Sequence, residues 1–121
     1  MPPAKVMIVE DEAIVALSLE RAVRKMGHSV SCVVDKGEDA VIQFERQPAD
    51  VVLMDVRLKG DMDGIEAARL IVSRQRIPVI FLTAYNDSAT MSRAEDIPPA
   101  AFLSKPVDEV QLAVAICKAT S

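Results

Sequence analysis

Short runs of apolar residues alternate with longer amphipathic segments along the whole chain. Five of these runs have the length of β-strands, and three of them lack a polar face, as strands buried on both sides of a sheet do. The predicted strands are residues 6–9, 30–34, 51–54, 79–82 and 101–103. Because helical patterns separate them, the sequence predicts an α/β fold in which helices cover both faces of a parallel sheet.

The segments between the strands carry apolar residues at helical spacing. Gly27 is placed to end the first helix, and Asp63 is placed to cap the start of the third. The fourth helix, around residues 87–95, has few apolar residues to bury and is the weakest of the five patterns. The last helix is expected to bury one stripe, formed by Val107, Val110, Val114 and Cys117.

Size and charge limit the classes of function. A chain of 121 residues, half of them hydrophobic, fits one domain over residues 1–121. Aromatic residues make up 3% of the chain, so a stacking surface for bases is not expected. The net charge of −4 also argues against binding of nucleic acid by this domain. No apolar run has the length needed to cross a bilayer, so no membrane association is expected.

Cys32 and Cys117 lie far apart and have no metal-ligand spacing. They are interpreted as small core residues of a protein in the reducing cytoplasm. His28 follows Gly27 in a connection and is expected to be a surface loop residue.

Polar residues stand at the ends of the predicted strands that would line one pocket. Glu10 and Asp11 follow the first strand, Asp55 follows the third, Thr83 follows the fourth and the fifth runs into Lys105. Ligands of doubly wound sheets bind at the carboxyl ends of the strands, where the strand order reverses. If the order is 2-1-3-4-5, this point lies between the first and third strands, and the three acids converge there.

Three carboxylates in contact repel one another by roughly 4 kcal/mol per close pair at an effective dielectric constant near 20. Such a cluster needs a cation, and carboxylate oxygens suit Mg²⁺ or Mn²⁺. Lys105 is able to neutralise Asp55 and later a phosphoryl oxygen, while the Thr83 hydroxyl is able to donate to another. These groups are typical of a phosphoryl-transfer site.

In this arrangement the chain resembles the receiver domain of two-component response regulators, of the chemotaxis-regulator type, from Lys5 to the end of the last helix. The matching positions are Glu10, Asp11, Asp55, Thr83 and the Lys105–Pro106 dipeptide. The resemblance implies a flavodoxin-like sheet in the order 2-1-3-4-5 flanked by five helices. It also implies a signalling module rather than an enzyme, apart from its own phosphotransfer and slow autodephosphorylation.

By the same resemblance, Asp55 accepts a phosphoryl group from a sensor histidine kinase or a histidine phosphotransfer protein. The metal is then held by Asp11, Asp55 and the backbone carbonyl of Arg57, and by Glu10 through water. A cis peptide bond is implied before Pro106.

Phosphorylation is expected to draw Thr83 inward, with Phe102 following. This movement is expected to change the surface formed by the fourth helix, the fifth strand and the fifth helix. That surface is expected to bind a downstream target or a fused output domain. Phosphorylation-dependent dimerisation is a further expected outcome. Phe102 lacks the hydroxyl that is common at its position, so a role as a core aromatic stays open beside the switch role. Arg57 and Tyr85, each two positions beyond a site residue, are expected to control access of the hydrolytic water.

The loop after Asp55 departs from the usual receiver pattern. It reads RLKGDMDG, with Gly60 in place of the common Met-Pro, so its path is open.

Two other classes make an alternative. A phosphohydrolase of the haloacid dehalogenase type needs a second aspartate two residues after the nucleophile, where this chain has Arg57. A flavodoxin-like cofactor binder needs a phosphate loop after the first strand, where Glu10, Asp11 and Glu12 would repel a phosphate. Both fit the sequence less well than the signalling module.

Overall fold

The computed structural model describes residues 3–84, 88–94, 97 and 100–121. In these residues, strands and helices alternate along the chain. The strands are β1 (Lys5–Val9), β2 (Ser29–Val34), β3 (Val51–Asp55), β4 (Val79–Thr83) and β5 (Ala100–Ser104). The helices are α1 (Ala13–Lys25), α2 (Gly37–Arg46), α3 (Gly64–Arg74), α4 (Ser88–Arg93) and α5 (Glu109–Thr120).

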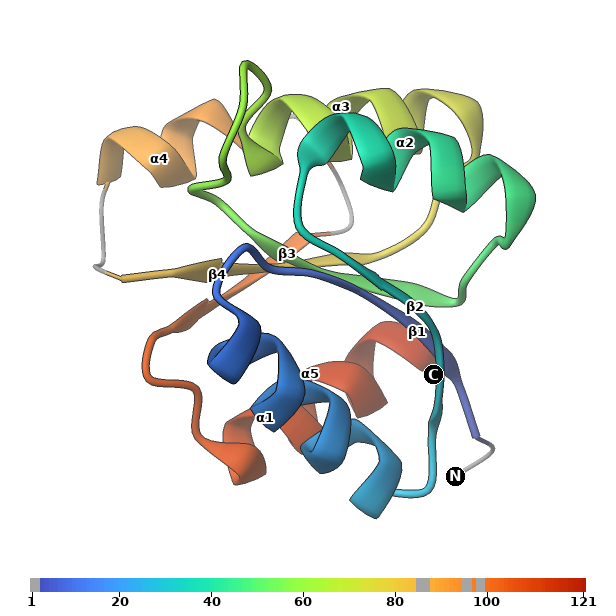
Figure 1. The fold of residues 1–121 in the computed structure, drawn as a ribbon. Helices are drawn as coiled ribbons and strands as arrows, with labels where there is room; N and C mark the ends of the chain where they lie inside the picture. The colour runs from blue at the N-terminus through green and yellow to red at the C-terminus, as the bar shows by residue number, and fades with distance from the viewer. Residues whose placement is uncertain (1–2, 85–87, 95–96, 98–99) are drawn as a thin grey trace.

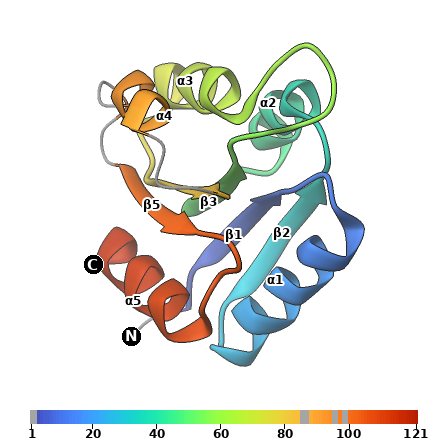
Figure 2. The same ribbon diagram turned by 90° about the vertical axis from the view of Figure 1, so that its left-hand side faces the viewer.

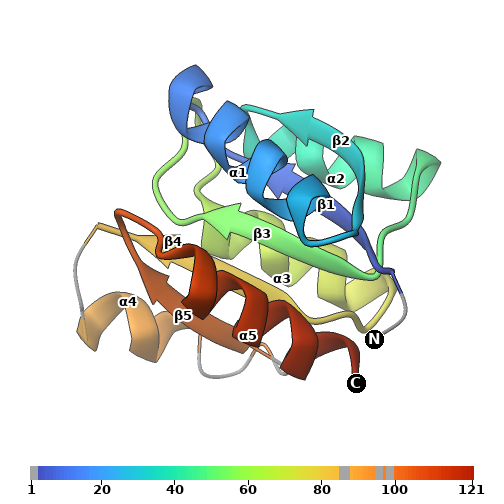
Figure 3. The same cartoon turned by 90° about the horizontal axis from the view of Figure 1, so that it is seen from below.

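The strands form one parallel sheet in the order β2-β1-β3-β4-β5. Figure 1 shows the sheet as the middle layer, with α2, α3 and α4 on one face and α1 and α5 on the other. The doubly wound, flavodoxin-like fold predicted from the sequence is therefore confirmed. Figure 3 shows α1 and α5 lying side by side across their face of the sheet.

The core has two parts, one on each face of the sheet. On the face covered by α2, α3 and α4, Phe44 and Ile71 pack against side chains of the sheet. On the face covered by α1 and α5, Leu19 and Ile116 do so. The central strands β3 and β4 are buried along their whole length. Burial on both faces explains why their sequences lack a polar alternation.

Gly27 ends α1 as the sequence predicts, with a φ of 93° that favours glycine. The prediction for His28 was wrong, because its side chain is only 6% exposed. The parallel pairing of Lys5 with Ser29 brings the start of β1 beside the start of β2. The backbone N–H of Ala4 there donates to His28 Nδ1 at 2.9 Å.

The buried face of α5 also differs from the prediction. Val110 and Val114 are exposed, and Cys117, predicted to be in the core, is exposed as well. The residues that pack against the sheet are Leu112 and Ile116. Helix α5 carries apolar residues on more than one face, so helical spacing alone does not identify the face that contacts β3, β4 and β5.

The loop between β3 and α3 lies against the loop between β2 and α2. Lys59 forms an isolated parallel β-bridge with Lys36, and Gly60, at a φ of 91°, sits beside the carboxylate of Glu38. Asp63 then caps α3 by accepting the N–H of Glu66 at 2.9 Å, as predicted. This contact fixes the path that the sequence left open. Among the described residues, no helix has both the length and the hydropathy to cross a membrane.

Candidate functional site

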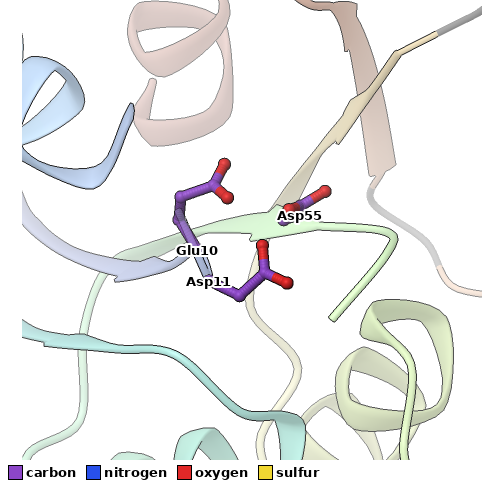
Figure 4. Close-up of side chains that lie close together, drawn as sticks. All are labelled: Glu10, Asp11 and Asp55. Carbon is purple, nitrogen blue, oxygen red and sulfur yellow. The ribbon is translucent and has the colours of Figure 1, made fainter. Parts of the chain in front are cut away.

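Three carboxylates meet at the carboxyl edge of the sheet, between β1 and β3. Glu10 and Asp11 directly follow β1, and Asp55 is the last residue of β3. One carboxylate oxygen from each lies within 4.8 Å of the others. Figure 4 shows the three side chains at this point, and Figure 2 shows how β1 and β3 run beside each other there. Because the two strands are parallel neighbours, their carboxyl ends bring the acids together.

Lys105 lies between two of these acids. Its Nζ is 2.7 Å from Glu10 Oε1 and 3.1 Å from Asp55 Oδ2. The backbone N–H of Lys105 donates to the carbonyl of Thr83 at 2.7 Å, which places Lys105 directly past the ends of β4 and β5. The peptide bond between Lys105 and Pro106 is cis. A single cation thus balances part of the negative charge that the sheet gathers at this edge.

Asp11, Asp55 and Lys105 line a cavity of about 210 Å³. Its lining residues are Asp11, Glu12, Asp55, Val56, Arg57, Thr83, Ala84 and Lys105. Glu10 lies beside the cavity rather than in its wall, at 2% exposure, and one of its oxygens accepts the N–H of Glu12 at 3.1 Å. The cavity has room for a small anion or a hydrated ion next to Asp55.

Burial and mutual repulsion set the charge of the acids. Burial, followed by the neighbouring Glu10, raises the pKa of Asp55 to about 7. The same two causes, in the same order, raise the pKa of Asp11. Burial alone would also raise the pKa of Glu10, but its bonds with Lys105, Asp55 and the Glu12 amide outweigh burial and lower it. With a pKa of about 7, Asp55 is therefore protonated in part of the molecules at neutral pH when no metal is bound.

Burial acts on the pKa of Lys105 in the opposite direction to its effect on the acids. Burial by itself would lower the pKa of its ammonium group, but the bonds to Glu10 and Asp55 outweigh burial and raise it. Lys105 is therefore charged at neutral pH.

The donor set fits a hard divalent cation. Every candidate side-chain ligand is a carboxylate oxygen, which is the chemistry that Mg²⁺ and Mn²⁺ prefer. Burial, followed by the neighbouring Glu10, raises the pKa of Asp55, and a bound cation would offset both effects. The residues present therefore fit the predicted metal.

The remaining predicted residues are distributed around this centre. Thr83 lies in the cavity wall, and the backbone N–H of Arg57 donates to Asp55 Oδ1 at 3.2 Å. The ring of Phe102 stacks on Phe81 with 5.4 Å between centroids, so it forms part of the packing around β4 and β5. Tyr85 lies outside the described residues.

Two features of the site were not predicted from the sequence. The contact of Lys105 with Glu10 is shorter than its contact with Asp55, and only the second was expected. Gly64, the first residue of α3, packs so closely on the backbone of Asp55 that a Cβ atom there would overlap the Asp55 carbonyl oxygen. An Asp-Gly pair soon after an acid-terminated strand is the sequence feature that would have pointed to it.

A parallel α/β sheet with a carboxylate cluster, a hydroxyl residue and a lysine at one pocket defines a class: small phosphoacceptor domains that work with a divalent metal. The profile of the family described as "Response regulator receiver domain" matches residues 6–117, so the chain belongs to that family. It is a receiver domain of two-component signalling.

Proteins similar to this chain share the family. The transcriptional regulatory protein PdtaR of Mycobacterium tuberculosis is 35% identical over 119 residues, which cover 98% of this chain and 58% of PdtaR. The phyllosphere-induced regulator PhyR of Methylorubrum extorquens is 32% identical over 95% of this chain and 43% of PhyR. The chain thus spans about half the length of these two relatives.

A solved structure gives the same fold. The signal receiver domain of a modulated diguanylate cyclase from Desulfovibrio desulfuricans G20 superposes with a TM-score of 0.92 at 34% identity, over 98% of this chain and 94% of that one.

Proposed function

We propose that Asp55 is the phosphoacceptor of this receiver domain. The observation that carries the proposal is the position of Asp55 at the end of β3, 4% exposed, in one cavity with Asp11, Thr83 and Lys105. A carboxylate beside a lysine and a metal-binding acid pair is placed both to attack phosphorus and to have its product stabilised.

In the proposed transfer, a carboxylate oxygen of Asp55 forms a bond to the phosphorus of a phosphohistidine on a sensor histidine kinase or histidine phosphotransfer protein. The phosphorus–nitrogen bond breaks, and the electron pair leaves with the imidazole. The product is an acyl phosphate on Asp55. Lys105 Nζ, at 3.1 Å from Asp55 Oδ2, moves from the carboxylate to a phosphoryl oxygen, and the Thr83 hydroxyl donates to another.

Glu10, Asp11, Asp55 and the Arg57 carbonyl would hold Mg²⁺, or Mn²⁺ in its place. When bound, the metal supplies positive charge to the transferring phosphoryl oxygens and offsets the repulsion among the acids. Among the residues that the structure describes, Lys105 is the cation in contact with both Glu10 and Asp55 when no metal is bound.

The acyl phosphate is expected to be lost slowly to water. Arg57, beside the cavity, and Tyr85 are proposed to limit the access of that water. If Arg57→Ala and Tyr85→Ala leave the lifetime of the phosphorylated chain unchanged, this role is wrong for both residues.

The proposed output is a change in the surface formed by α4, β5 and α5. In the chain, α4 and β5 follow Thr83, and α5 follows Lys105. Inward movement of Thr83 would be followed by Phe102, which already packs against β4 through Phe81. Partners are a downstream target or a fused output domain, and dimerisation on phosphorylation is a further outcome. One PhyR of Bartonella quintana is described as an anti-anti-sigma factor, which illustrates an output attached to a similar receiver.

Phosphoryl transfer is tested with a small acyl phosphate, acetyl phosphate, as the donor. The wild-type chain with Mg²⁺ is expected to gain the mass of one phosphoryl group, and the gain is lost with a chelator or in Asp55→Asn. Lys25→Gln, far from the site, is the matched control and is expected to react like the wild type. No mass gain by the wild type, or an undiminished gain with the chelator, would refute the proposal.

A further inference from the structure

Two hydrogen bonds join α3 and its N-cap to the last residue of α4. Arg93, the last residue of α4, donates from Nη2 to Asp63 Oδ2 at 2.8 Å. Arg69 of α3 donates from Nη2 to the backbone carbonyl of Arg93, also at 2.8 Å. Figures 1 and 2 both show α4 beside α3 on the same face of the sheet. We call Asp63, Arg69 and Arg93 the α3–α4 clamp.

Both contacts of the clamp have charges that suit the helix ends they join. Asp63 places its negative charge at the N-terminus of α3, where its other oxygen accepts the N–H of Glu66. Arg69 places its positive charge at the C-terminus of α4. Burial alone would raise the pKa of Asp63, but the Glu66 amide and the Arg93 guanidinium outweigh burial and lower it.

Helix α4 depends on such contacts more than the other helices do. It has six residues, too few for a helix to be stable in water by itself. Among the described residues near its end, Ala94 and Ile97 are buried and supply apolar packing, and the clamp adds polar contacts. Loss of the clamp therefore removes contacts that hold α4 against α3.

The clamp is also connected to the phosphoacceptor through the backbone. Gly64, next to Asp63, donates its N–H to the carbonyl of Val56 at 2.8 Å and leaves no space for a Cβ beside the Asp55 carbonyl. The start of α3 therefore follows the end of β3 closely. In the chain, α4 comes after Thr83, which ends β4, and its last residue, Arg93, belongs to the clamp.

We infer that the α3–α4 clamp holds α4 in one arrangement on α3 and sets how readily phosphorylation of Asp55 moves it. The first half of this inference concerns the unphosphorylated chain alone. The second half rests on the proposed function. By linkage, a contact that favours the unphosphorylated arrangement opposes the phosphorylated one by the same free energy.

The first half is tested by amide hydrogen exchange over residues 88–94 without a phosphodonor. Arg93→Gln and Asp63→Asn are each expected to speed exchange there by about threefold to tenfold, since asparagine still caps α3 but loses the charge. The double variant is expected to match the larger single effect, because both changes remove the same bond. Arg93→Lys should recover part of the protection. Arg21→Gln on α1, across the sheet, is the matched control. Unchanged exchange, or fully additive effects, would overturn the clamp.

The second half is tested by the same exchange after reaction with acetyl phosphate and Mg²⁺. The wild type is expected to show faster exchange over residues 88–94 when phosphorylated, with a smaller increase in Arg93→Gln, where α4 is already released. Equal increases in the two proteins, or no increase in the wild type, would overturn this half. If the wild type takes up no phosphoryl group, the proposed function fails instead, and the comparison of unphosphorylated chains still decides whether the clamp exists.

Discussion

At the scale of single residues, the central feature is a lysine shared by two buried acids. Glu10 and Asp55 are 2% and 4% exposed, and Lys105 contacts both. Each acid costs free energy to bury as a charge, and Lys105 offsets part of that cost. Lys105 therefore contributes to the stability of the unphosphorylated domain, and in the proposed function it also stabilises the charge of the phosphoryl group.

Replacement of Lys105 tests its contribution to the stability of the folded domain. Without metal at about pH 8, Lys105→Gln is expected to lower the free energy of unfolding by about 2 kcal/mol, because it leaves two buried carboxylates without a cation and only protonation of Asp55 limits the loss. Urea unfolding followed by circular dichroism measures it. Lys25→Gln, which loses an exposed pair with Glu109 at 4.0 Å, is expected to change little. Equal effects of the two substitutions would contradict the shared-lysine account.

The raised pKa of Asp55 predicts how stability depends on pH. Between the ordinary value of 3.8 and the folded value of about 7, the folded chain binds more protons than the unfolded one. In a chelator, the Asp55 contribution to stability is therefore present at low pH and is lost as the pH rises through this window. Mg²⁺ should restore it, so its effect on the melting temperature should be larger at about pH 8 than at about pH 5. An effect of Mg²⁺ that does not change with pH, or is larger at about pH 5, would contradict this sign.

At the scale of elements, the ends of strands were easier to predict than the faces of helices. A buried parallel strand must be apolar throughout, so its end is visible in the sequence, as at Asp55 and Thr83. Helix α5 has apolar residues around much of its surface, and only its position on the sheet decides that Ile116 is buried and Val114 is not. His28 was misread for a related reason, since its partner Ala4 is brought to it by strand pairing.

Two substitutions in α5 test which face packs on the sheet. Ile116→Ala is expected to destabilise the domain by about 2–4 kcal/mol, because it leaves a cavity beside Leu112. Val110→Ala, at a position 71% exposed, is expected to cost less than about 0.5 kcal/mol. Thermal or urea unfolding measures both. The reverse order of effects would restore the stripe predicted from the sequence.

Gly64 tests the contact between α3 and the phosphoacceptor strand. Gly64→Ala puts a Cβ atom onto the Asp55 carbonyl oxygen, so it is expected to cost about 1–3 kcal/mol and to weaken Mg²⁺ binding by displacing Asp55. Gly27→Ala is the matched control. It introduces strain at a φ of 93° but meets no atom within 4 Å, so it should lower stability and leave Mg²⁺ affinity unchanged. If Gly64→Ala binds Mg²⁺ like the wild type, the contact does not position Asp55.

At the scale of the whole molecule, the sequence was enough to predict the fold class and the edge of the sheet where the acids gather. The fold class follows from the alternation of strands and helices, and the edge follows from the strand order 2-1-3-4-5 that the family resemblance implied. The contacts that the sequence did not predict join segments far apart in the chain, such as Lys105 with Glu10 and Arg93 with Asp63. They depend on where helices and loops come to rest, which no local pattern determines.

The central claim, that Asp55 carries the phosphoryl group, is tested most directly by locating the acyl phosphate. After reaction with acetyl phosphate and Mg²⁺, reduction with borohydride converts a phosphorylated aspartate into homoserine, which peptide mass spectrometry places at one position. The predicted result is homoserine at position 55 in the wild type and none in Asp55→Asn. Reduction at Asp11 or at another acid in the wild type, or an unmodified peptide around position 55, would contradict the claim.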